Sequence, residues 1–395
     1  MASHGVPRGP RIRTDEQKRL DSEKIQKYHE LEEQIRSSPA YDETVFANTT
    51  RLLRLNPEYY TTAAWVAVLG CALDYISDRN LDVLLRRLLR YALGHEPIER
   101  PVGPDDVLNA VGELQFTIPL LLEFPKCYWI WSYRLWVLEQ AVTRLDAPRA
   151  RQIWEDELAL DSKMLTKDRR NFHAWGYRRQ VVERLESEDL SVDTTTAAAS
   201  SRSLVEPEFE YTTKMIHRDL SNFSAWHNRS KLIPRLLAER DADDAARTAF
   251  FEEELNIIRD ALNVGPEDQS LWFYHQFLML DLIEYMGRPT MVPHLTLEER
   301  MTYITRELED IRDLMTDYDD VKWIYEALFE YTLAVAKMED RPLSEAERVE
   351  VQAWLAQLRK LDPKRNGRWD DLELEHIRGR KPNFEQESIA ASTGL

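Results

Sequence analysis

The sequence predicts an all-α protein, a right-handed superhelix (an α-α solenoid) of stacked helical hairpins. A motif of an aromatic residue, two residues, Trp, two residues and Arg occurs three times, and a looser fourth copy has His in place of Arg. A Glu followed by an apolar residue lies 18 residues before each Trp, and another apolar residue lies ten residues before it. The four tryptophans are Trp131, Trp175, Trp226 and Trp272, and the four glutamates are Glu113, Glu157, Glu208 and Glu254.

The spacing within each repeat indicates two helices. Two apolar positions seven residues apart predict one face of a first helix. A short polar break follows, and a second helix begins near the Trp. Because one hairpin cannot bury its apolar face alone, several hairpins have to stack on one another.

The N-terminal third departs from this pattern. Residues 1–14 carry Gly, Pro and Arg without apolar periodicity, so they predict a flexible arm. Within it, His4 is either part of a disordered arm or a residue that reaches a partner's zinc. Residues 15–36 place a thin apolar stripe among Glu, Lys and Arg, which predicts a helix that caps the array or lies on a partner. We interpret residues 61–111 as a divergent insertion into the first repeat.

The remainder continues the array. Residues 187–207 contain a run of Thr, Ala and Ser and predict a flexible loop. Two more hairpins are expected at residues 303–323, ending in Trp323, and at residues 347–369. Residues 376–395 predict a flexible tail. The helical-repeat body is therefore expected to span residues 15–375.

Composition excludes several classes of protein. The net charge of −18 argues against nucleic-acid binding, which needs Lys and Arg in excess. Cys71 and Cys127 are too few for a disulfide framework and have no metal-ligand spacing, so we expect the cytoplasm and no metal site in this chain. No stretch approaches 18 uninterrupted apolar residues, so a membrane protein is not expected.

The repeats resemble those of protein prenyltransferase α subunits over about residues 112–370, and are most similar to the Rab (type II) geranylgeranyltransferase branch of that family. The resemblance rests on five stretches of sequence taken together. These are residues 125–134, residues 170–178, residues 267–272, residues 361–365 and the N-terminal His4-Gly5.

This resemblance implies a crescent of hairpins around a separate β subunit, an α/α barrel that holds zinc and the lipid pocket. The chain alone would be inactive. The heterodimer would transfer geranylgeranyl from geranylgeranyl diphosphate to C-terminal cysteines of Rab GTPases, which an escort protein presents. Two alternatives stay open: the α subunit shared by farnesyltransferase and type I geranylgeranyltransferase, and a non-catalytic helical-repeat scaffold.

By resemblance, Lys126 would bind a diphosphate oxygen and His173 would be a second donor, while Tyr128 and Asn171 line or order the same site. Charge accumulates on the diphosphate as its bond to C1 breaks, and a fixed cation there lowers the barrier. The repeat itself places Lys126 and Arg170 at equivalent hairpin tips on one edge of the array, where side chains are not committed to the core.

Structural roles compete for most of these residues. Lys126 can be a surface lysine, His173 a structural histidine and Tyr128 partly packing. Asn171 and Asn222 can cap helices. The tryptophans are expected in the core. The repeated arginines are expected to link adjacent repeats through the repeated glutamates; they are Arg134, Arg178 and Arg229.

Two departures from the family pattern bear on the substrate. Trp129 stands where the enzymes that modify CaaX proteins have a Gln that holds the peptide carboxylate. An indole accepts no hydrogen bond, so Trp129 favours the Rab-type enzyme. Phe172 replaces a second site tyrosine, which removes a hydroxyl and leaves any role at that position open.

Overall fold

The structure is a computed structural model that describes residues 14–37, 48, 51–52, 55, 105–191 and 203–377. His4, the arm as far as residue 13, most of the predicted insertion and the end of the tail lie outside the described residues. Within the described ranges every regular element is helical and no strand occurs, which confirms the all-α prediction. The chain divides into two compact units, residues 1–202 and residues 203–395, and each is described by itself.

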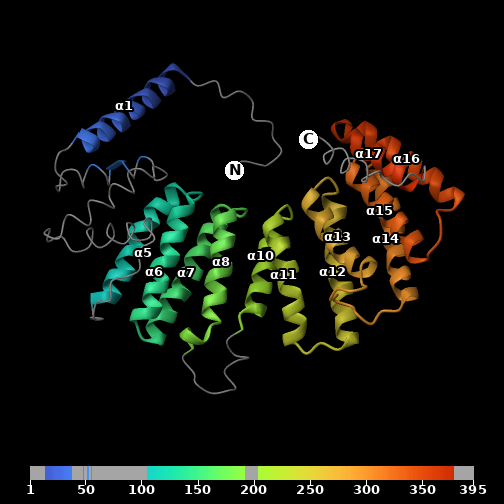
Figure 1. The fold of residues 1–395 in the computed structure, drawn as a ribbon, viewed down its shortest axis with the longest axis horizontal. Coiled ribbons are helices and arrows are strands. Elements are labelled where there is room, and N and C mark those ends of the chain that lie inside the picture. The colour runs from blue at the N-terminus through green and yellow to red at the C-terminus, as the bar shows by residue number, and fades with distance from the viewer. Residues whose placement is uncertain are drawn as a thin grey trace, which may run out of the picture. The chain divides into compact units, whose positions relative to one another are not determined.

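The described residues of unit 1 form two hairpins. The first pairs α5 (Asp105–Glu123) with α6 (Tyr128–Arg144), and the second pairs α7 (Ala147–Lys167) with α8 (Phe172–Leu185). Helix α6 also packs against α7 and α8, so the hairpins lie side by side (Figure 1). The other described elements are α1 (Asp15–Ser37), which agrees with the predicted helix, and the short 3₁₀ helix η1 (Glu188–Leu190).

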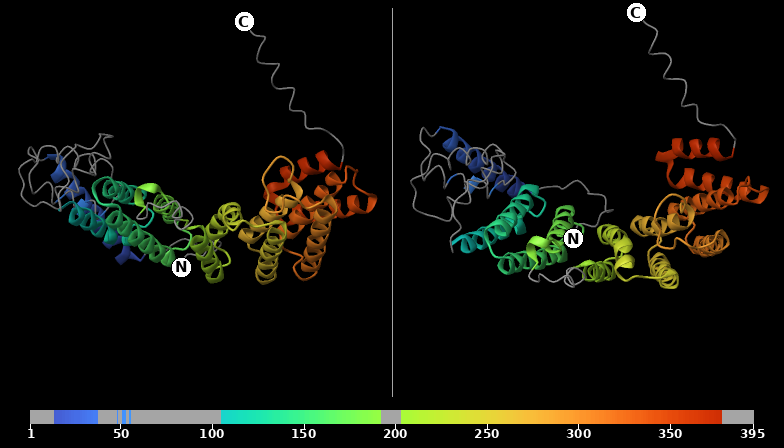
Figure 2. Two further views of the ribbon diagram at one scale, coloured as in Figure 1. Left: turned by 90° about the horizontal axis from the view of Figure 1, so that it is seen from below. Right: turned by 60° about the horizontal axis from the view of Figure 1, so that its bottom comes forward.

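Residues 203–377 of unit 2 form four hairpins, and neighbouring pairs remain adjacent in the further views of Figure 2. Helix α13 contacts α11, α14 and α15, so these hairpins stack as well. The pairs are α10 (Val205–Arg218) with α11 (Phe223–Glu239), α12 (Asp244–Val264) with α13 (Gln269–Ile283), α14 (Leu297–Asp317) with α15 (Lys322–Met338), and α16 (Glu345–Leu361) with α17 (Asn366–His376), the last joined by η2 (Pro363–Arg365).

Local signals explain where helices begin outside their expected ranges. Helix α5 starts inside the predicted insertion with two aspartates, which suit the positive end of a helix dipole. Helix α10 starts inside the predicted loop of residues 187–207 and carries Glu206 and Glu208 in its first turn. Helix α14 begins earlier than residue 303, because Thr296 and Glu299 form a capping box.

The repeated tryptophans are buried, as expected, and each ties a hairpin tip to the second helix of its hairpin. Each indole N–H donates to the backbone carbonyl six residues earlier, so the tip is fixed as tightly as the helix itself. The acceptors are Pro125 at 2.9 Å from Trp131, Arg169 at 2.8 Å from Trp175, Leu220 at 2.8 Å from Trp226 and Pro266 at 2.6 Å from Trp272.

The hairpin of α14 and α15 corrects the expectation that Trp323 belongs to the core. The hydroxyl of Tyr325 donates to the carbonyl of Asp319, six residues earlier, at 2.7 Å. Tyr325 is 6% exposed, whereas Trp323 is only partly buried. Tyr325 therefore occupies the tryptophan position, and the aromatic residue two positions earlier misled the spacing argument.

A buried clamp links consecutive hairpins. Arg134 on α6 donates to both carboxylate oxygens of Glu157 on α7, at 3.0 and 2.5 Å, and Tyr177 on α8 donates to Glu157 at 2.5 Å. Burial alone lowers the pKa of Arg134, but the charge of Glu157 raises it overall. Burial and the charge of Glu157 raise the pKa of Tyr177 well above its ordinary value, so its hydroxyl keeps the donated proton. The predicted link between adjacent repeats is confirmed for this pair.

The same clamp recurs in unit 2. Arg229 on α11 donates to Glu254 on α12 at 2.8 and 2.5 Å, and Tyr274 on α13 donates to Glu254 at 2.5 Å. Arg178 makes contacts within its own hairpin, at 3.4 Å to Asp161 and 2.9 Å to the hydroxyl of Ser162. Side chains that form bidentate ion pairs of this kind fix the register between neighbouring helices.

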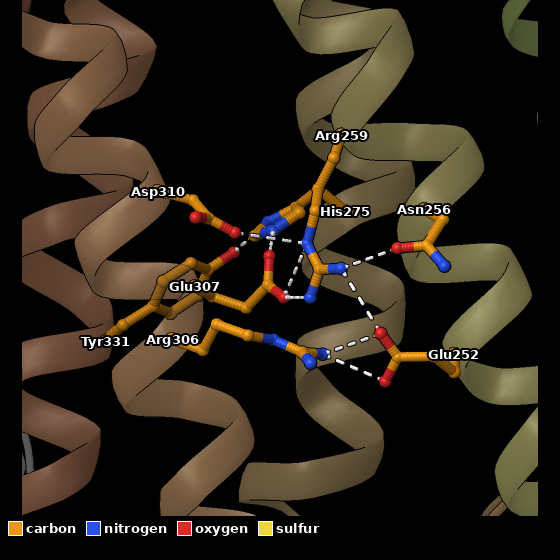
Figure 3. A network of polar contacts seen from close by, with 8 residues as sticks. All are labelled: Glu252, Asn256, Arg259, His275, Arg306, Glu307, Asp310 and Tyr331. Carbon is orange, nitrogen blue, oxygen red and sulfur yellow. Dashed lines mark hydrogen bonds and ion pairs between the residues drawn. The ribbon is translucent and has the colours of Figure 1, made fainter.

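In the clamp between α13 and α14, a histidine takes the place of the arginine (Figure 3). His275 on α13 stands in the arginine position, with Nε2 3.0 Å from Glu307 and Nδ1 2.9 Å from the hydroxyl of Tyr331. Each ring nitrogen of His275 therefore has a polar partner. A permanent positive charge is supplied by Arg259 on α12, whose guanidinium donates to Glu307. The arginine of this clamp thus lies on α12, the first helix of its hairpin, whereas Arg134 and Arg229 lie on the second helix of theirs.

Candidate active-site edge at the hairpin tips

Two neighbouring hairpin tips in unit 1 carry all four predicted site residues. Lys126 lies in the tip of residues 124–127 between α5 and α6, and Tyr128 begins α6. Asn171 ends the tip of residues 168–171 between α7 and α8, and His173 lies in the first turn of α8. The equivalence of the two tips that the repeat predicted is therefore visible in the fold.

Asn171 joins these tips. Its Nδ2 donates to the carbonyl of Pro125 at 2.9 Å, and its Oδ1 accepts from the backbone N–H groups of His173 and Ala174 at 3.0 and 3.1 Å. The side chain is 2% exposed. Asn171 therefore caps α8 and orders the loop that carries Lys126. Asn222 caps α11 in the same way, accepting from Ala225 at 3.2 Å.

The carbonyl of Pro125 is the contact that sequence reasoning missed. It accepts from the indole of Trp131 at 2.9 Å and from Asn171 at 2.9 Å, so the residue before Lys126 is held from both hairpins. The Pro125-Lys126 pair was visible in the sequence, but its partner Asn171 lies 46 residues away, so the contact between them could not be predicted.

The side chains around this junction are accessible. Lys126 is exposed and forms no hydrogen bond or ion pair with the described part of the chain. Tyr128 is 47% exposed. His173 is partly exposed and lies edge-to-face against Phe172, whose ring is 78% exposed, with centroids 5.7 Å apart. The side chain of Trp129 lies outside the described residues.

The electrostatics of this edge suit an anion. Helices α6 and α8 both begin here, and neither has an acidic residue in its first turn, so the positive ends of their dipoles are not neutralised locally. The second tip contains Arg169 and Arg170 together with one carboxylate, Asp168, so its charged residues sum to one positive charge. Lys126 adds a mobile ammonium that can reach a phosphate oxygen.

Two tips of unit 2 carry acidic residues instead. In the tip of residues 265–268, Glu267 and Asp268 follow Gly-Pro, and in the tip of residues 318–321, Asp319 and Asp320 are adjacent. These two tips would repel phosphate oxygens, whereas the tip between α16 and α17 carries Lys364 and Arg365.

Among the described residues no group of three His, Cys, Asp or Glu side chains is arranged to hold a metal ion. Cys127, beside Lys126, is 2% exposed and packs into the core. None of the described helices has the length and apolar character needed to cross a membrane.

Comparisons with known proteins agree with this architecture. The family model for the protein prenyltransferase alpha subunit repeat matches residues 111–141, 154–185, 205–236 and 251–282. These segments fall on the hairpins α5/α6, α7/α8, α10/α11 and α12/α13. The fold and its repeats thus define a protein prenyltransferase α subunit.

Full-length relatives narrow this class. The chain is 31% identical to the geranylgeranyl transferase type-2 subunit alpha of Saccharomyces cerevisiae, over 91% of this chain and 95% of the relative. It is 29% identical to the Candida albicans protein of the same name, over 96% of this chain and 99% of the relative. The mouse protein of that name is 30% identical over 67% of this chain and 39% of its own length. The chain belongs to the family of geranylgeranyl transferase type-2 α subunits.

Exchanging Asn171 for aspartate separates its two roles. Asn171→Asp keeps the oxygen that caps α8 but removes the N–H that donates to Pro125. We expect a melting temperature below that of the wild type, because the new carboxylate oxygen faces the buried carbonyl of Pro125 without a donor, and a lipid-transfer rate reduced about tenfold, because a displaced tip misplaces Lys126. Asn171→Ala should lose the cap as well and cost about 0.5–2 kcal/mol of stability. Thermal melting and transfer kinetics of the assembled heterodimer measure the two effects.

Equal transfer rates for Asn171→Asp and the wild type would contradict this role for the bond between the two tips.

Proposed function

We propose that this chain is the α subunit of a heterodimeric Rab geranylgeranyltransferase. The enzyme transfers geranylgeranyl from geranylgeranyl diphosphate to C-terminal cysteines of Rab GTPases, which an escort protein presents in the cytoplasm. The observation that carries the proposal is the junction of the two unit 1 tips, where Lys126 and His173 lie at two unneutralised helix N-termini. The name shared by the relatives, type-2 subunit alpha, favours the Rab branch over the enzymes that modify CaaX proteins.

The contribution of this chain is electrostatic. In the transfer, the acceptor sulfur forms a bond to C1 of the lipid, the bond from C1 to oxygen breaks, and the electron pair leaves with the diphosphate. Lys126 donates to a diphosphate oxygen and stabilises the charge that develops there. His173 is a second donor, Tyr128 lines the site with its exposed ring and hydroxyl, and Asn171 orders the tip. Zinc, held by the β subunit, would supply activation of the acceptor thiol.

This division of roles agrees with the donor set. The described residues offer cations and helix N-termini but no cluster of metal ligands. We assign the lipid and the zinc to the β subunit, as the resemblance implies, and expect the chain alone to be inactive.

Co-expression with two kinds of β subunit tests the assignment. We expect size-exclusion chromatography to show a stable complex with a Rab-type β subunit and none with a CaaX-type β subunit. A complex with the CaaX-type subunit would favour the α subunit shared by farnesyltransferase and type I geranylgeranyltransferase. A complex with neither would leave a helical-repeat scaffold.

A further inference from the structure

A groove in unit 2 lies far along the chain from the hairpin tips that carry Lys126. It has a volume of about 320 Å³ and is formed by the second helices α13 and α15 together with η2 and α17. Its walls combine large aromatic rings with two carboxylates. They are Trp272, Phe273, Trp323, Tyr331, Glu326 and Glu330.

The aromatic wall presents apolar surface to solvent. Phe273 is 45% exposed, and its ring lies edge-to-face against Trp323 with centroids 6.0 Å apart. An exposed aromatic pair beside buried rings is typical of a surface that a partner covers.

The carboxylates of the groove have too few donors. Arg368 on α17 lies 2.7 Å from Oε1 of Glu326 and 3.6 Å from Glu330. Gln276 donates to Glu330 at 2.8 Å. The other cation at the rim, Arg365, is 3.5 Å from Asp362. One exposed guanidinium is therefore shared between two glutamates one helical turn apart.

One oxygen of this pair is left without a donor. Oε2 of Glu326 is buried and accepts no hydrogen bond within the described ranges of the chain. Burial, and then the charge of Glu326, raise the pKa of Glu330 above its ordinary value. The two carboxylates therefore share one guanidinium, and a second cation in the groove would offset the charge that remains.

We propose that this groove receives an arginine or lysine side chain of the β subunit. The proposal rests on the proposed function, because it assumes that this chain has such a partner. A guanidinium fits best, since it can donate to the accessible oxygens of Glu326 and Glu330 and stack on the ring of Phe273, whereas the ring of Trp323 already carries the ammonium of Lys322 at 4.5 Å. A purely apolar occupant would leave the two carboxylates with one guanidinium between them, and an anion would be repelled. The groove is thus an anchor for a basic residue at the subunit interface.

The paired substitution Glu326→Gln with Glu330→Gln tests the anchor in the full chain. Titration of fluorescently labelled Rab-type β subunit should give a dissociation constant roughly 10- to 100-fold above that of the wild type. The affinity of the wild type should also fall more steeply with salt than that of the variant. The free variant should melt no lower than the wild type, because two like charges in one groove have been removed.

A matched control removes two exposed carboxylates from α14. Glu309→Gln with Asp313→Asn changes the net charge equally, and it should bind the β subunit like the wild type. Unchanged affinity of the Glu326/Glu330 variant, or an equal loss in the control, would overturn the anchor while leaving the proposed function intact. If the Glu326/Glu330 variant loses a homodimer of this chain but keeps the heterodimer, the groove binds a second copy of the chain. That outcome would also overturn the anchor. Failure of the wild-type chain to bind the β subunit would overturn the proposed function itself.

Discussion

Replacing Lys126 with alanine is expected to lower the rate of lipid transfer by the assembled heterodimer about 100- to 1,000-fold. Lys126 is exposed at the tip between α5 and α6 and is free of contacts with the rest of the described chain, so its loss leaves no buried group unpaired. The diphosphate is already negative when it binds, and its charge increases as it leaves, so the ammonium stabilises the transition state more than the ground state. The loss should therefore appear in kcat, and kcat/KM should fall at least as much.

Two further variants distinguish this effect from a general loss of positive charge. Lys231→Ala removes an exposed lysine from within α11 in unit 2 and should retain wild-type transfer. His173→Ala should lower kcat by less than Lys126→Ala, because the histidine is the secondary donor. Co-elution with the β subunit should be unchanged in all three. A kcat of Lys126→Ala equal to that of the wild type would contradict a role in lipid transfer and leave Lys126 as an ordinary surface lysine.

Breaking a clamp should produce the largest loss of stability. Arg229→Met leaves Glu254 buried, charged and served only by the hydroxyl of Tyr274. Removing one partner of a buried ion pair costs about 3–5 kcal/mol, which corresponds to a fall of roughly 6–20 °C in the melting temperature of a unit of this size. Thermal unfolding followed by circular dichroism measures the fall.

The chain offers a matched control for this experiment. Arg240 and Glu206 form an ion pair of the same length, 2.5 Å, in the same unit, but their side chains are 42% and 49% exposed. Arg240→Met should cost about 1 kcal/mol or less. Combining Arg229→Met with Glu254→Leu and Tyr274→Phe should recover most of the lost stability, because no buried charge then remains. Equal falls for Arg229→Met and Arg240→Met would contradict the clamp.

The hairpins could be predicted from the sequence because their determinants are local. Each Trp bonds to a carbonyl only six residues away, and each first helix carries its apolar face at a fixed distance from that Trp. The fifth hairpin departed from the prediction for a local reason as well. Trp323 and Tyr325 are both aromatic, but only Tyr325 has a Glu 18 residues before it, Glu307, and Tyr325 is buried whereas Trp323 is only partly buried.

Long-range exchanges could not be predicted in this way. The replacement of Arg by His275 was visible in the motif, but the compensating cation, Arg259, lies 48 residues before Glu307 and on another helix. No spacing rule links them, because the helices meet only after the hairpins have stacked. The bond from Asn171 to Pro125 spans 46 residues and escaped prediction for the same reason.

The sequence predicted which residues make up the candidate site, but not the contacts that position them. Lys126, Tyr128, Asn171 and His173 were expected on one edge, and the two tied tips carry all four. Their roles as ligands of the diphosphate remain a proposal. The structure adds that Asn171 is committed to capping and to the Pro125 carbonyl, which makes it a positioning residue.

Lipid transfer by the purified heterodimer tests the central claim most directly. The chain would be assembled with a Rab-type β subunit and mixed with labelled geranylgeranyl diphosphate, a Rab GTPase and an escort protein, next to a parallel reaction with a CaaX peptide. We expect label on the C-terminal cysteines of Rab only when the escort protein is present, and none on the peptide. Label on the peptide alone, or on neither acceptor despite a stable heterodimer, would contradict the account.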